Sequence, residues 1–114
     1  MVPHGMGVVL CAPAVFRYTA PTNPERHLRC AQLLGADTSG AGLEDAGELL
    51  AAAIVGYIRE LGLPNGLSGV GYTVEDVDAL VAGTLPQHRV TKLSPRPVDE
   101  TSLRQLFLDS MTLW

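Results

Sequence analysis

The clearest pattern in the sequence is an apolar stripe between Ala46 and Leu61. Its apolar side chains recur three and four positions apart, which places them on one face of a helix with 3.6 residues per turn. Glycine and proline residues follow directly, beginning at Gly62, and indicate that the helix ends there. The predicted buried face consists of Ala46, Leu49, Leu50, Ala53, Ile54, Tyr57, Ile58 and Leu61.

Two helices are predicted before this stripe. Residues 8–16 are apolar on every side, which is typical of a buried helix, and Pro13 within them can kink or shorten it. A second helix is expected after Asn23, because a side-chain oxygen at that position can cap a helix start. It should end near Leu34, since Gly35 is suited to the turn that closes a helix.

Two more helices are predicted towards the end of the chain. Thr73 can cap the first of them, which Pro86 closes, and Asp99 can cap the second. Residues 36–43 lack apolar periodicity and are predicted to form a loop. Residues 87–97 contain two prolines and are predicted to be an extended connector.

Length and composition agree with one small globular domain. The chain has 114 residues, 46% of them hydrophobic and 18% charged. A chain this apolar can offset the entropy lost on ordering by burying side chains. With five predicted helices and no convincing strand, we predict an all-α helical bundle over residues 1–114.

Charge and hydropathy exclude two classes of partner. The formal net charge is -4 with only 8 lysines and arginines, so no basic cluster is present to neutralise phosphates or bind an anionic bilayer. The longest apolar stretches, residues 8–16 and 49–58, are shorter than the roughly 20 residues of a membrane-spanning helix. We therefore expect no nucleic-acid partner and no membrane association.

Few residues suggest chemistry. The sequence contains neither of the two common phosphate-binding loops, G-x-G-x-x-G and G-x-x-x-x-G-K-[ST]. It also lacks the G-x-S-x-G motif of serine nucleophiles and the H-E-x-x-H motif of zinc proteases. Cys11 and Cys30 lack the spacing of a zinc or redox motif. Since each lies in an apolar helical pattern, both are predicted to be reduced and to pack in the core.

The three histidines are too far apart in sequence to form a local ligand cluster. His27 falls in the first turn of a predicted helix, where a solvated or capping role is expected, and His88 is expected to be exposed in the connector. His4 stands between Pro3 and Gly5 at the start of an apolar helix, where its ring can point into a cleft. From chemistry alone a ligand role for His4 stays open, because an imidazole ligand needs partner donors that this chain does not supply.

The string Pro3-His4-Gly5, followed by an apolar helix, resembles the segment of iron-containing (group III) alcohol dehydrogenases that supplies the last histidine ligand of the metal. The resemblance covers essentially all 114 residues in order. It is most specific between residues 83 and 97, which are similar to the hydroxyacid-oxoacid transhydrogenase branch of that family. The strings that carry this likeness are Gly83-Thr84-Leu85-Pro86-Gln87 and Val90-Thr91-Lys92-Leu93-Ser94-Pro95.

The resemblance implies a fold and a metal ligand. The chain would be the C-terminal half of a dehydroquinate synthase-like, iron-type alcohol dehydrogenase helical domain, with the nucleotide-binding domain outside residues 1–114. His4 would be one imidazole ligand of a divalent metal, and an Asp and two further histidines would lie upstream. A nicotinamide nucleotide would be bound by the N-terminal domain, so we assign no cofactor-binding residue to this chain.

The activity implied is hydride transfer from a hydroxy acid such as 4-hydroxybutyrate to 2-oxoglutarate, giving succinate semialdehyde and 2-hydroxyglutarate. We expect the chain to be inactive alone and to require the N-terminal half of the enzyme or a second copy as partner. Two alternatives stay open: a segment of a plain iron-type alcohol dehydrogenase, and a non-catalytic, stand-alone helical interaction module. A cytoplasmic location is expected, or a mitochondrial one if a targeting segment precedes the chain.

Overall fold

The computed structural model describes residues 2–114, the side chains of 89 and 90 excepted, and is helical throughout. The all-α prediction is confirmed, since this part of the chain contains no strand, and none of its helices has the length and apolar content needed to cross a bilayer. The α-helices are α1 (His4–Thr19), α2 (Pro24–Leu33), α3 (Ala46–Glu60), α4 (Val77–Thr84), α5 (His88–Thr91) and α6 (Glu100–Asp109). Short 3₁₀ segments are η1 (Ala20–Thr22), η2 (Leu43–Asp45), η3 (Leu67–Val70) and η4 (Val74–Asp76).

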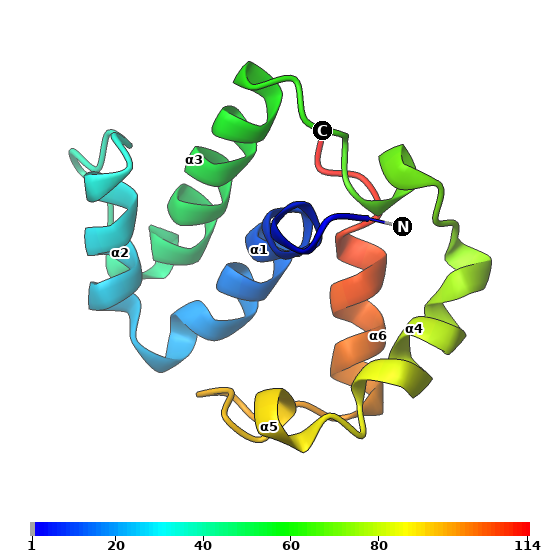
Figure 1. Ribbon diagram of the computed structural model, residues 1–114. Coiled ribbons are helices and arrows are strands. Elements are labelled where there is room, and N and C mark those ends of the chain that lie inside the picture. Colours follow the sequence, from blue (N-terminus) through cyan, green and yellow to red (C-terminus); the bar gives the residue numbers. More distant parts are fainter. Residues whose placement is uncertain (1) are drawn as a thin grey trace.

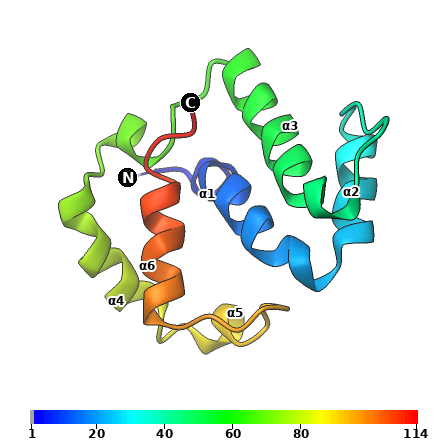
Figure 2. The same cartoon turned by 180° about the vertical axis from the view of Figure 1, so that it is seen from behind.

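Helix α1 runs through the middle of the molecule (Figures 1 and 2). Helix α3 packs against one side of α1 and carries α2 on its outer side. Helix α6 packs against another side of α1 and carries α4. The core therefore forms where α1 meets both groups of helices, and it consists of Leu10, Ile58, Leu67, Val77, Val81, Leu103 and Met111.

Two of the three predicted helix caps, Asn23 and Asp99, are confirmed, whereas Thr73 precedes η4 and α4 begins only at Val77. The Asn23 side chain accepts a hydrogen bond of 3.2 Å from the Arg26 amide. Asp99 accepts one of 2.7 Å from the Ser102 amide, and the Asp99 amide donates back to the Ser102 hydroxyl at 2.9 Å. Both arrangements satisfy amides that the first turn of a helix leaves without a partner.

The prediction of an extended connector over residues 87–97 is wrong in part, because α5 forms one helical turn there. The prolines of this region lie outside residues 88–91, so every amide of that turn can donate. The Thr91 amide donates to the Gln87 carbonyl at 3.0 Å, and the Thr91 hydroxyl donates to the same carbonyl at 3.2 Å. Proline spacing thus leaves room for a short helix that apolar periodicity does not reveal.

Helix α1 also differs from its prediction. It continues through Pro13, which neither ends nor shortens it, and Leu10, Pro13 and Ala14 are buried. However, Val8 is 57% exposed and Phe16 is 36% exposed, so α1 is not buried on every side. Helices α3 and α6 cover two sides of α1 and η3 contacts it as well, but part of its apolar surface stays open.

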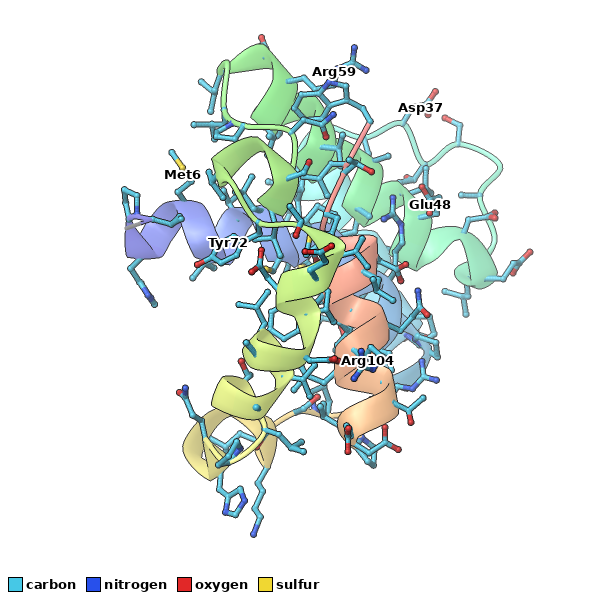
Figure 3. The ribbon with its side chains drawn as sticks, turned by 90° about the vertical axis from the view of Figure 1, so that its right-hand side faces the viewer. Met6, Asp37, Glu48, Arg59, Tyr72 and Arg104 are labelled. Carbon is cyan, nitrogen blue, oxygen red and sulfur yellow. The ribbon has the colours of Figure 1, made fainter. Side chains whose placement is uncertain are left out.

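Helices α1 and α3 approach closely at Gly47. A Cβ atom at this position would lie 2.8 Å from the Ala20 Cβ and 3.3 Å from the Arg17 Cα. Beside this crossing, Arg17 Nε forms a 2.8 Å ion pair with Glu48, which Figure 3 labels. The missing side chain of Gly47 therefore sets how near the two helices can come.

Candidate functional site

His4 is the first residue of α1, and its side chain is exposed. Pro3 precedes it with φ -55° and ψ 143°, the extended conformation that leads into the helix. The next glycines add no bulk, since even a Cβ at Gly5 or Gly7 would meet no atom within 4 Å. The imidazole is therefore open to a ligand or a second polypeptide on this side of the molecule.

Apolar side chains attach the start of α1 to the core. Met6 and Val9 pack against the cluster that contains Leu10, as do Val70 and Tyr72 from the segment around η3. Figure 3 labels Met6, which extends from the first turns of α1, and Tyr72, which lies beside this helix. The accessible imidazole thus extends from a helix whose opposite face is held by core contacts.

One imidazole can supply one ligand of a divalent metal, but a complete site takes about four donors. Within residues 2–114 as described, no group of three or more His, Cys, Asp or Glu side chains lies close enough together to hold a metal. The donor set of the chain therefore fits a single ligand position at His4. The remaining donors of such a site would have to come from other polypeptide.

Both ring nitrogens of His27 have protein partners, whereas a solvated or capping role was expected. Its Nδ1 donates to the Asn23 carbonyl at 2.8 Å, since a carbonyl can only accept. Its Nε2 lies 2.8 Å from the Thr19 hydroxyl, and its ring meets Phe16 edge-on at 6.1 Å. His88 is exposed at the start of α5, as predicted. Neither histidine lies in a ligand cluster with His4.

The two cysteines are free, as predicted, but their burial differs. Cys11 is partly buried, and burial raises the pKa of its thiol, an effect that a hydrogen bond with Ser110 partly opposes. Cys30 is exposed, so its predicted core position is wrong. The reason is that α2 packs mainly on α3 and buries only Ala31, leaving Cys30 on an open face.

That open face is one wall of an apolar groove between α1, α2 and α3, with a volume of about 410 Å³. Phe16, which lines it, lies 12 positions after His4, or roughly 18 Å along the helix axis at 1.5 Å per residue. The groove is therefore separate from the candidate ligand position. Sequence patterns did not reveal it, because it is formed by three helices together. Its lining residues are Phe16, Arg26, His27, Cys30, Leu33, Leu34, Leu50 and Ile54.

Comparison with known proteins gives a consistent picture. Residues 1–111 match the sequence pattern described as Fe-containing alcohol dehydrogenase family, C-terminal. All 114 residues align at 54% identity with the probable mitochondrial hydroxyacid-oxoacid transhydrogenase of Dictyostelium discoideum, covering 21% of its length. The human mitochondrial hydroxyacid-oxoacid transhydrogenase is 52% identical over 114 residues, 24% of its length.

A solved structure is also similar. The crystal structure of 1,3-propanediol oxidoreductase superposes with a TM-score of 0.85 and 28% identity, over 96% of this chain and 28% of that one. The chain thus spans only about a fifth to a quarter of the length of the curated relatives it matches.

Proposed function

The chain belongs to the Fe-containing alcohol dehydrogenase family, and we propose that it is the C-terminal helical part of an enzyme with hydroxyacid-oxoacid transhydrogenase activity. The observation that carries this proposal is the identity of about half the residues, over the full 114, with transhydrogenases from organisms as distant as Dictyostelium and human. The mitochondrial location in the names of these relatives favours the mitochondrion over the cytoplasm for this protein.

The proposed reaction moves a hydride from a 4-hydroxybutyrate-type hydroxy acid to 2-oxoglutarate through a nicotinamide nucleotide. His4 would contribute one imidazole to a divalent metal site, completed by donors outside residues 1–114. When bound, such a metal supplies Lewis-acid polarisation of the substrate's alcohol oxygen. The nicotinamide carries the hydride, and its binding site would lie in the N-terminal domain.

What this chain supplies itself is an accessible ligand on a supported helix. His4 is exposed at the first position of α1, with no side chain at Gly5 or Gly7 to shield it. The apolar contacts of Met6 and Val9 hold the same two turns against the core. This combination favours a ligand contributed across an interface with the N-terminal half of the enzyme.

A hybrid enzyme tests the proposal. The 114 residues would replace the aligned C-terminal segment of the Dictyostelium relative, and metal content and 4-hydroxybutyrate-dependent reduction of 2-oxoglutarate would be measured. We expect the hybrid to be active and His4→Ala to weaken metal binding by at least about 100-fold, more than the 10–100-fold typical of losing an outer-shell partner. The matched control, His88→Ala, removes an exposed imidazole elsewhere and should leave both quantities unchanged.

An active hybrid that keeps its metal after His4→Ala would refute the ligand assignment. A well-folded hybrid that ignores metal and lacks hydride transfer would refute the enzyme proposal and favour a non-catalytic helical module.

A second candidate function is a plain iron-type alcohol dehydrogenase. The likeness to 1,3-propanediol oxidoreductase favours it, although at lower sequence identity than the transhydrogenases. Because the nucleotide site would lie in the N-terminal domain, the two are distinguished with these 114 residues joined to their own N-terminal domain. A transhydrogenase couples the two acids without added nucleotide, whereas an alcohol dehydrogenase oxidises an alcohol only while external NAD is supplied.

A further inference from the structure

The start of α1 has little intrinsic helical stability. Pro3, at the N-cap, makes no side-chain capping bond, and the first turn contains no acidic residue to interact with the helix dipole. Gly5 and Gly7 each disfavour a helix relative to alanine. The two turns that carry His4 therefore depend on tertiary contacts to remain helical.

Part of these contacts comes from the segment around η3. Leu67 belongs to the same buried cluster as Leu10, and Val70 and Tyr72 pack against it together with Met6. The 3₁₀ turn also contacts α1 directly. The position of η3 thus sets part of the surface on which the first turns of α1 rest.

Backbone hydrogen bonds join η3 to the chain after α6. The Leu67 amide donates to the Ser110 carbonyl and the Ser68 amide to the Met111 carbonyl, both at 2.9 Å. These two bonds place η3 alongside the last residues of the chain. In Figures 1 and 2 the C-terminal residues run beside the segment that contains η3.

Asn65 completes this connection through its side chain. Its Oδ1 accepts from the Leu113 amide at 2.6 Å and from the Trp114 amide at 3.0 Å. Its Nδ2 donates to the Trp114 carbonyl oxygen at 2.6 Å. Arg59, labelled in Figure 3, stacks over the Trp114 ring at 5.3 Å and adds a contact from the end of α3. One amide side chain therefore makes three hydrogen bonds to the C-terminal residues.

We propose that Asn65 is a positioning residue for His4: it holds η3 against the C-terminal residues, and η3 in turn holds the first two turns of α1. The inference rests on the proposed function in one respect, namely that His4 is a metal ligand. Loss of the Asn65 side chain should then loosen the start of α1, although Asn65 is not itself a proposed ligand.

Hydrogen exchange of the 114-residue chain tests the structural step. In Asn65→Ala we expect the amides of residues 7–10 to exchange about tenfold faster, because three side-chain hydrogen bonds are lost. The matched control is Asn23→Ala, which removes a capping hydrogen bond at the start of α2 and should accelerate exchange there only. If Asn65→Ala does not fold, Asn65→Asp retains the acceptor for the two amides and should give a smaller increase.

Cobalt binding to the hybrid enzyme tests the functional step, using the visible absorption of Co²⁺ as the signal. We expect Asn65→Ala to weaken Co²⁺ binding about tenfold, within the range for residues that orient a ligand, and Asn23→Ala to leave it unchanged. Unchanged exchange at residues 7–10 in Asn65→Ala, or unchanged Co²⁺ affinity, would overturn the inference. If Co²⁺ binding also survives His4→Ala, the proposed ligand role itself is wrong, which separates the two failures.

Discussion

Gly66 offers a sharp test of how η3 is held. Its backbone has φ 74° and ψ -168°, a combination that is essentially restricted to glycine. A Cβ there would lie 2.5 Å from the Met111 carbonyl oxygen and 2.6 Å from that of Ser110. We therefore expect Gly66→Ala to force η3 away from these carbonyls, which accept from the Leu67 and Ser68 amides at 2.9 Å.

The cost follows from these contacts. Backbone strain at such a position costs about 1–3 kcal/mol. Losing the two hydrogen bonds to the C-terminal residues costs about 1 kcal/mol each. Together they predict that Gly66→Ala lowers the free energy of unfolding by about 3–5 kcal/mol, a large part of the roughly 5–15 kcal/mol of a typical domain.

Urea denaturation followed by far-ultraviolet circular dichroism measures this loss. Gly62→Ala is the matched control, because Gly62 also has a positive φ, 71°, but a Cβ there would meet nothing within 4 Å. Strain alone predicts a loss of about 1 kcal/mol for Gly62→Ala. If Gly66→Ala were no more destabilising than Gly62→Ala, the close approach between η3 and the C-terminal residues would not be a stabilising feature.

Three further outcomes are expected. Gly47→Leu should lower the free energy of unfolding, measured by urea denaturation, by about 3 kcal/mol, because even its Cβ would lie 2.8 Å from the Ala20 Cβ. An unchanged midpoint of urea denaturation would contradict the close approach of α1 and α3 at this position. Hydrogen bonds from the Ser102 amide and hydroxyl lower the pKa of Asp99. The stability from this cap is therefore present above the ordinary Asp pKa and is lost as the pH falls through the lowered pKa. Asp99→Asn caps the helix without titrating and should reduce this acid sensitivity, measured by urea unfolding at a series of pH values. Burial raises the pKa of the Cys11 thiol, whereas Cys30 is exposed. Near neutral pH, iodoacetamide should therefore alkylate Cys30 at least about tenfold faster than Cys11, as followed by peptide mass spectrometry. Equal rates at the two cysteines would contradict the burial of Cys11.

The helices themselves were largely predictable because their signals are local. Asn23 and Asp99 cap the helices that they were expected to cap, and the stripe from Ala46 to Leu61 corresponds to α3 within one residue. The exception, α5, is a single turn between prolines, too short for apolar periodicity to indicate it.

Burial was less predictable than helicity. Tyr57 and Leu61 lie on the predicted apolar face of α3, yet they are 46% and 71% exposed. Gly47 and Ala51, which were not on that face, are buried because α1 crosses α3 beside them. Which part of an apolar helix is covered depends on the direction from which its neighbours approach, and that direction is not encoded in the helix's own periodicity.

At the candidate site, too, some features of His4 follow from the sequence and others only from the tertiary structure. Its position at the start of an apolar helix, and the likeness of the surrounding residues to a family that binds metal there, can be read from the chain alone. The sequence also determined the helix boundaries, since caps, prolines and glycines act over a few residues. Only the tertiary structure brought η3, more than 60 positions further along the chain, against α1, and the C-terminal residues against η3. Such contacts arise from the packing of whole helices around a shared core, which local patterns constrain but do not specify.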